Sequence, residues 1–101
     1  MAIPSDRDRA VAATRFRALG DETRLRLLEI LIDGDCSVGE LMETTGLGQS
    51  LVSHHLGALR LAGLVTTRRA GRWIYYKTHQ PSLASLKLVL QGLEPIRADR
   101  G

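Results

Sequence analysis

The basic side chains of this chain gather in a stretch that contains no acid. The 50 positions between Glu43 and Glu94 hold no aspartate or glutamate, whereas residues 1–45 hold nine carboxylates against six arginines. Six cations and three histidines stand in the acid-free stretch: Arg60, Arg68, Arg69, Arg72, Lys77, Lys87, His54, His55 and His79. No neighbouring carboxylate in the sequence cancels their potential, so the stretch predicts binding of a polyanion such as nucleic acid. The alternative is an ordinary solvated surface.

Other kinds of chemistry fit the sequence poorly. The basic half has no acid to act as a general base, and the chain shows no cysteine–histidine pair at motif spacing and no phosphate-binding loop, so we expect no enzyme. A single cysteine, Cys36, excludes an intramolecular disulfide framework and fits a reducing cytosol. The first residues do not resemble a signal peptide, and no apolar run approaches the ~18 residues of a membrane span. We therefore expect a cytoplasmic protein.

Length and composition predict one small domain. The chain has 101 residues, of which 44% are apolar. A domain of this size buries only around two thirds of its unfolded surface, so pairing with a second copy would add useful burial. We expect a flexible N-terminal tail over residues 1–5, one folded domain over residues 6–95 and a C-terminal tail over residues 96–101.

Helical periodicity runs through the first half of the chain. It predicts a helix over residues 6–19, stopped by Gly20, and a second from Glu22 to about Ile32, capped by Asp21. The inward side chains expected on the second helix are Leu25, Leu28, Leu31 and Ile32.

Two further helices follow, separated by a short turn. Ser37 and Glu40 stand at capping-box spacing and open a short helix that ends near Thr45. The glycine-rich residues 46–48 form a turn, and a fourth helix runs from Gln49 to about residue 62. A helix, a three-residue turn and a second helix have the spacing of a helix-turn-helix.

The period then changes to that of strands. Residues 64–68 and 72–77 are rich in β-branched and aromatic side chains, and residues 69–71 between them predict a hairpin with a basic tip. A last helix opens at Pro81 and Ser82 and is ended by Pro95. The expected fold class is mainly α with a small β-hairpin: about five helices and a two-stranded wing, forming a dimer.

The fourth helix has two distinct faces. Val52, Leu56 and Leu59 form a stripe that should be buried, with His55 packed beside it. The opposite face is small, polar and free of acids, and consists of Gln49, Ser50, Ser53, His54, Gly57 and Arg60. Such a face can enter a major groove, where Gln, Ser and His meet base edges, while the hairpin arginines Arg68, Arg69 and Arg72 reach phosphates or the minor groove.

Four blocks of the sequence resemble one family. Residues 18–28 (ALGDETRLRLL) are similar to the second-helix signature of the ArsR-type (ArsR/SmtB) bacterial repressors, and residues 49–56 (QSLVSHHL) resemble their recognition helix. Residues 59–65 and 71–77 match the helix end and the wing, so the resemblance covers about residues 10–94. It implies a homodimeric winged helix-turn-helix repressor that binds double-stranded DNA and leaves its operator when it binds an inducer. Because a two-fold dimer presents two identical helices, the operator should be an inverted repeat. Pairing would use the first and last helices, with the dimer residues Val11, Leu83, Leu86, Leu90 and Leu93.

The metal-sensing motifs of the family are incomplete. Arsenic and cadmium sensors carry Cys-x-Cys at the start of the third helix, where this chain has residues 37–39 (SVG) after a lone Cys36. Zinc sensors carry ligand pairs on the last helix, where at most His79 and Glu94 could serve. We therefore expect no metal and no cofactor, and the inducer remains unidentified.

The sequence is compatible with several alternatives. The domain could be a protein–protein interaction module without DNA binding, an RNA binder, or a metal-responsive repressor with a relocated site. Cys36 is interpreted as an inert residue at a helix start, and His79 as a cap or surface residue. The aromatic residues Trp73, Tyr75 and Tyr76 are expected to pack against the helices rather than stack on bases.

Overall fold

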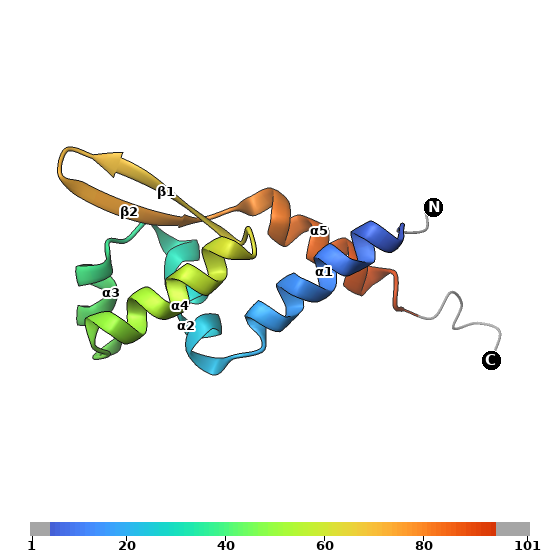
Figure 1. Cartoon of the computed structure of the whole chain (residues 1–101), viewed down its shortest axis with the longest axis horizontal. Coiled ribbons are helices and arrows are strands. Elements are labelled where there is room, and N and C mark those ends of the chain that lie inside the picture. Colours follow the sequence, from blue (N-terminus) through green and yellow to red (C-terminus); the bar gives the residue numbers. More distant parts are fainter. Residues whose placement is uncertain (1–4, 95–101) are drawn as a thin grey trace.

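Five helices and a two-stranded hairpin make up the part of the chain that the computed structural model describes, residues 5–94 (Figure 1). In chain order the elements are α1 (Asp6–Leu19), α2 (Glu22–Asp33), α3 (Val38–Thr45), α4 (Gln49–Leu61), β1 (Val65–Ala70), β2 (Trp73–Thr78) and α5 (Gln80–Gln91). The predicted tail over residues 96–101, the stop at Pro95 and residues 1–4 lie outside the described range. The expected mixture of helices and one hairpin is confirmed.

The elements divide between two ends of the molecule. Helices α2, α3 and α4 lie together beneath the hairpin, while α1 and α5 lie side by side toward the other end (Figure 1). The strands are antiparallel, with Val65 opposite Thr78 and Ala70 opposite Trp73. The largest fully buried side chains come from α2, α3, α4, the connection after α4 and the start of β1: Leu27, Leu31, Leu41, Val52, Leu56, Leu59, Leu64 and Val65. Burying each such side chain stabilises the fold by about 1.5–3 kcal/mol.

Local sequence signals explain where the helices begin. Ser5 and Ser37 each open a helix with a full capping box, formed with Asp8 and Glu40 respectively. Ser5 was expected to belong to a loose tail, but its hydroxyl accepts the backbone N–H of Asp8 at 3.0 Å and thus fixes the start of α1. Gly46, at the end of α3, takes a φ of 77°, a left-handed conformation that favours glycine.

The inward face of α2 differs by one position from the expectation. Leu25 and Ile32 are 47% and 59% exposed, whereas Leu27 is fully buried. The buried stripe begins with the half-buried Arg24 and continues three, four and seven residues later with leucines. A search for apolar residues at helical spacing misses this stripe, because its first residue is an arginine. The long apolar stem of an arginine can be buried while its charged head group finds hydrogen-bond partners.

The ends of the hairpin and of the last helix also differ from the expectation. Arg69 and Ala70 were assigned to the loop, but both pair with β2, which leaves a two-residue loop at Gly71 and Arg72. Gly71 takes a φ of 63°, as the first residue of tight hairpin loops often does. Helix α5 ends at Gln91, several residues before Pro95. None of the helices within residues 5–94 is sufficiently long and apolar to cross a membrane.

Asp21 caps α2, and its loss should destabilise the domain. Its carboxylate accepts the backbone N–H of Arg24 at 3.1 Å. We expect Asp21→Ala to lower the Tm by roughly 4–8 °C, which is typical for the loss of a capping acceptor in a domain of this size. Asp21→Asn is the matched control, because its amide oxygen can still accept this hydrogen bond. Calorimetry at pH 7 measures both, and equal losses would show that the cap contributes nothing.

The cap should also respond to pH. The pKa of Asp21 lies below its ordinary value, chiefly because the backbone N–H of Arg24 binds the charged form. A carboxyl with a lowered folded pKa stabilises the fold above its unfolded pKa of about 3.9 and loses this effect as the pH falls through the folded value. The Tm difference between wild type and Asp21→Ala should therefore shrink below about pH 4. An equal difference at pH 3 and pH 7 would contradict a role for the charge.

Candidate nucleic-acid interface

The outer face of α4 is open to solvent. All six residues expected on this face are exposed: Gln49, Ser50, Ser53, His54, Gly57 and Arg60. The opposite stripe, Val52, Leu56 and Leu59, is completely buried, as expected. A Cβ atom at Gly57 would meet no other atom within 4 Å, so this glycine leaves open space on the outer face. The face combines hydrogen-bonding groups with little bulk, which a helix needs in order to approach base edges closely.

One arginine holds α4 in place from behind. The Nη1 atom of Arg24 lies 3.1 Å from Nδ1 of the buried His55, and Nε of Arg24 donates to the carbonyl of Ala18. A guanidinium group can only donate, so Nδ1 of His55 is the acceptor. Arg24 therefore joins the end of α1, the start of α2 and the middle of α4. The expectation that His55 packs with a satisfied nitrogen is confirmed, whereas the role of Arg24 was not foreseen from the sequence.

The hairpin is fastened to the start of α3 through its backbone. The N–H of Cys36 donates to the carbonyl of Tyr76 at 3.1 Å, and the N–H of Tyr76 donates to the carbonyl of Cys36 at 2.7 Å. Burial, followed by the nearby charges of Glu40 and Asp35, raises the pKa of the Cys36 thiol. A raised pKa disfavours the reactive thiolate, which supports the interpretation of Cys36 as inert.

Arg68 is less available than its sequence position suggested. Its Nε atom lies 2.8 Å from Oδ2 of Asp35, and its guanidinium lies 4.7 Å from the ring centroid of Tyr75. The acid comes from the connection between α2 and α3, so a carboxylate from the acidic half reaches the basic hairpin. The absence of acids along the basic stretch of the sequence therefore does not keep an acid away from Arg68 in the fold. Both side chains are partly exposed, and such pairs stabilise a fold by only about 0–1 kcal/mol.

Arg69 and Arg72 remain exposed near the tip of the hairpin. Arg69 contacts the carbonyl of Gly71 at 3.5 Å, and the guanidinium of Arg72 lies 5.4 Å from the Trp73 ring centroid. Trp73 is 55% exposed, so it packs less closely against the helices than expected, whereas Tyr76 does pack against the core. Trp73 begins its strand close to the tip, beyond the reach of the core.

The residues considered as metal ligands are not brought together. Within residues 5–94 no three histidine, cysteine, aspartate or glutamate side chains form a group that could hold a metal ion. His79 occupies the N-cap position of α5 without a side-chain capping hydrogen bond, and its Nδ1 atom lies 2.7 Å from Oγ of Ser82.

The surface formed by α1 and α5 carries the exposed apolar side chains expected of a dimer interface, in a different pattern. Leu86 is only 4% exposed within one protomer, and Leu83 is partly buried against the same core, so these two have little surface to offer. The other three expected residues, Val11, Leu90 and Leu93, are exposed, and so is Leu88, which was not expected to take part. A groove of about 1120 Å³ runs between the two helices, and three of these four side chains, Val11, Leu88 and Leu93, line it.

Known proteins are similar to this chain in sequence and in fold. The bacterial regulatory proteins of the arsR family match residues 21–67. The uncharacterised HTH-type transcriptional regulator Rv0081 of Mycobacterium tuberculosis is 43% identical over 75 residues, which make up 73% of this chain and 66% of that protein. This chain thus spans slightly less than two thirds of the length of that relative.

Solved structures extend the similarity to nearly the whole fold. An ArsR-like transcriptional regulator from Rhodococcus superimposes with a TM-score of 0.78 at 32% identity, covering 83% of this chain and 79% of the other. The homodimeric winged helix-turn-helix DNA-binding domain of Mb0332 from Mycobacterium bovis gives a TM-score of 0.72 at 32% identity, covering 93% and 94%. The sequence match and the shared winged helix-turn-helix fold together show that this chain belongs to the ArsR family of bacterial regulatory proteins.

Proposed function

We propose that this protein is a homodimeric repressor that binds an inverted-repeat operator in double-stranded DNA in the bacterial cytoplasm. The observation that carries the proposal is the outer face of α4, which is exposed, polar and free of acids while the opposite face is completely buried. In this arrangement α4 enters the major groove, and its Ser53 and His54 meet base edges. Arg69 and Arg72 of the hairpin contact phosphates, which contributes affinity without sequence choice.

The proposed dimer places two copies of α4 on one side of the DNA. Because a two-fold axis relates the two copies, the DNA must offer two identical half-sites, whose centres lie roughly 10 bp or a multiple of this apart. Pairing through α1 and α5 is supported by the exposed apolar side chains along their groove and by the homodimeric state of the similar Mycobacterium bovis domain. Release by an inducer is the behaviour that the family resemblance implies.

The main competing function is a protein–protein interaction module that does not bind DNA. The exposed Leu51 flanks the outer face of α4, and the exposed Leu61 lies on that face at its C-terminal end, four residues after Gly57. The part of the face that precedes Leu61 is polar or glycine. A gel shift with random duplex over a series of salt concentrations separates the two functions. Salt-sensitive binding supports the DNA-binding proposal, and an absence of binding at low salt contradicts it.

The outer face of α4 should determine sequence choice. We expect Ser53→Ala and His54→Ala each to change base preference at one or two positions per half-site, at about 1–3 kcal/mol per position. Selection from random duplex DNA by each variant measures this. Thr14→Ala on α1 is the control and should select the wild-type sequence. Identical selected sequences for all four proteins would show that this face does not read bases.

The hairpin should determine affinity, and Asp35 should limit it. Arg72→Ala should flatten the log–log salt dependence of random-duplex binding by about 0.9, the effect of one phosphate contact.

Asp35→Asn should instead strengthen binding and steepen this dependence, because it releases Arg68. Asp33→Asn makes the same change in charge at the end of α2 and serves as the control. Equal effects of the two aspartate variants would contradict a specific restraint on Arg68.

The exposed leucines of α5 should hold the dimer together. Leu88→Arg and Leu90→Arg put a charge into the proposed apolar interface, where an unpaired ion costs several kcal/mol. We expect monomers in sedimentation, with the helix content retained. Leu61→Arg, at a highly exposed position on α4, is the matched control and should remain dimeric. Dimers formed by the two α5 variants would place the interface elsewhere.

A further inference from the structure

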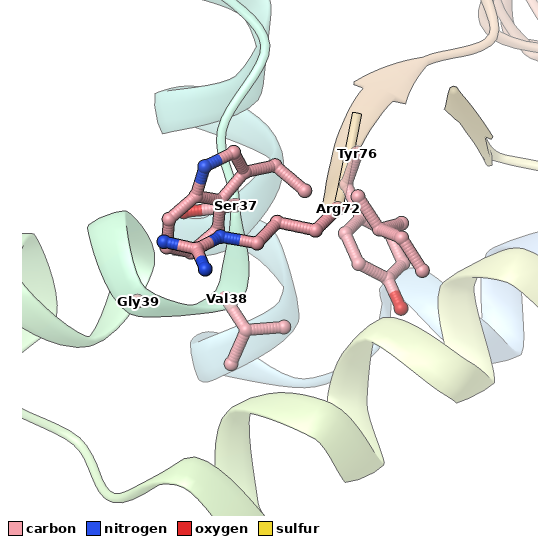
Figure 2. Close-up of a pocket in the computed structure, with 7 residues that line it drawn as sticks. Ser37, Val38, Gly39, Arg72 and Tyr76 are labelled. Atoms are coloured by element: carbon pink, nitrogen blue, oxygen red, sulfur yellow. The ribbon is translucent and has the colours of Figure 1, made fainter. Parts of the chain in front are cut away.

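A small open cavity lies between the hairpin and the start of α3. Its volume is about 260 Å³, and seven residues line it: Ser37, Val38, Gly39, Arg72, Trp73, Ile74 and Tyr76. Figure 2 shows Arg72 extending from the hairpin toward the first turn of α3, with Val38 and Tyr76 on the same cavity. This volume lies just below the range typical of small-molecule sites, which restricts the ligand to a compound with a single ring.

The lining combines apolar walls with one cation. Trp73 and Ile74 are 55% and 45% exposed, so much of their apolar surface still meets water. No acid lines the cavity. Glu40, the acid in the first turn of α3, directs its carboxylate at the backbone N–H of Ser37, 2.9 Å away, as part of the capping box. Arg72 is therefore the only charged group that lines the cavity.

We propose that this cavity binds a small aromatic carboxylate. The ring would cover the exposed surfaces of Trp73 and Ile74 and so remove apolar area from water. The carboxylate would pair with the guanidinium of Arg72, whose planar set of donors matches the two oxygens of the anion.

The same arginine would couple this ligand to DNA. This step rests on the proposed function, in which Arg72 contacts a phosphate. Arg72 cannot serve a phosphate and a bound carboxylate equally well, so the ligand and DNA weaken each other's binding. By linkage, the factor by which DNA weakens ligand binding equals the factor by which the ligand weakens DNA binding. The cavity would thus act as an inducer site in which the ligand competes for a DNA-contacting side chain.

The intrinsic fluorescence of the protein tests the site without DNA. Trp73 is the only tryptophan in the chain, so its emission reports on this cavity directly. Titration of the purified protein with benzoate should change the emission with a Kd on the order of 0.1–1 mM, as expected for so small a ligand. Benzamide and benzamidine have the same ring but are neutral and cationic, and should bind roughly tenfold more weakly or not at all.

Two variants and a control locate the binding. Arg72→Gln should weaken benzoate binding roughly tenfold or more through loss of the charged partner. Gly39→Leu adds a side chain at the cavity wall without backbone strain, because Gly39 is helical with an ordinary φ, and should block benzoate while leaving duplex binding unchanged. Lys77→Gln removes a positive charge from β2 at a position that does not line the cavity, and this variant should bind benzoate like wild type.

Release of DNA is measured separately, with a duplex selected from a random pool by the wild-type protein. Benzoate should weaken binding of this duplex in wild type and in Lys77→Gln, but not in Gly39→Leu. Equal emission changes with benzamide and benzoate, or an unaltered response in Gly39→Leu, would overturn the site. Benzoate binding without DNA release would overturn the competition for Arg72. If the protein bound no DNA at all, the proposed function would fail while the fluorescence titration still decided whether the site exists.

Discussion

The rotation of α4 about its own axis is the constraint on which the rest of the structure depends. Successive residues of a helix are about 100° apart, so burying Val52, Leu56 and Leu59 fixes the direction of every other side chain on α4. The contact between Arg24 and His55 adds a directional restraint to this apolar packing, because a hydrogen bond tolerates less rotation than apolar contact does. The direction in which the polar face of α4 points is therefore fixed by the buried contacts on the opposite side of the helix, and not by contacts of the polar residues themselves.

The helices and their order could be predicted from the sequence because their signals are local. Capping residues such as Asp21 and Ser37 and the glycines after α3 and α4 act over three or four positions, and the structure has the corresponding helix ends where they were expected. The inward face of α2 could not be predicted in the same way. Its leucines allow two neighbouring stripes, and the choice depends on Arg24, whose partners Ala18 and His55 lie on other helices.

The candidate site shows the same limit. The exposed residues of α4 were predictable, since a buried stripe on a helix implies an opposite face. The environment of the hairpin was not, because its neighbours are distant in sequence. Asp35 lies 33 positions before Arg68 yet comes within 2.8 Å of it, so the absence of acids along a segment does not imply their absence around it. Likewise, the leucine spacing of α5 predicted an apolar face, but Leu86 belongs to the buried core cluster that includes Ala12 of α1, whereas Leu88 is exposed.

The attachment of the hairpin at Cys36 and Tyr76 has a consequence for how this protein can change over evolutionary time. Both hydrogen bonds join main-chain atoms, so they form whatever side chains stand at the two positions, proline excepted where an N–H is needed. The segment before α3 can therefore gain or lose reactive side chains while the hairpin keeps its place. Such freedom separates the side-chain chemistry of this segment from the main-chain contacts that hold the hairpin, so a point substitution can change the first without disturbing the second.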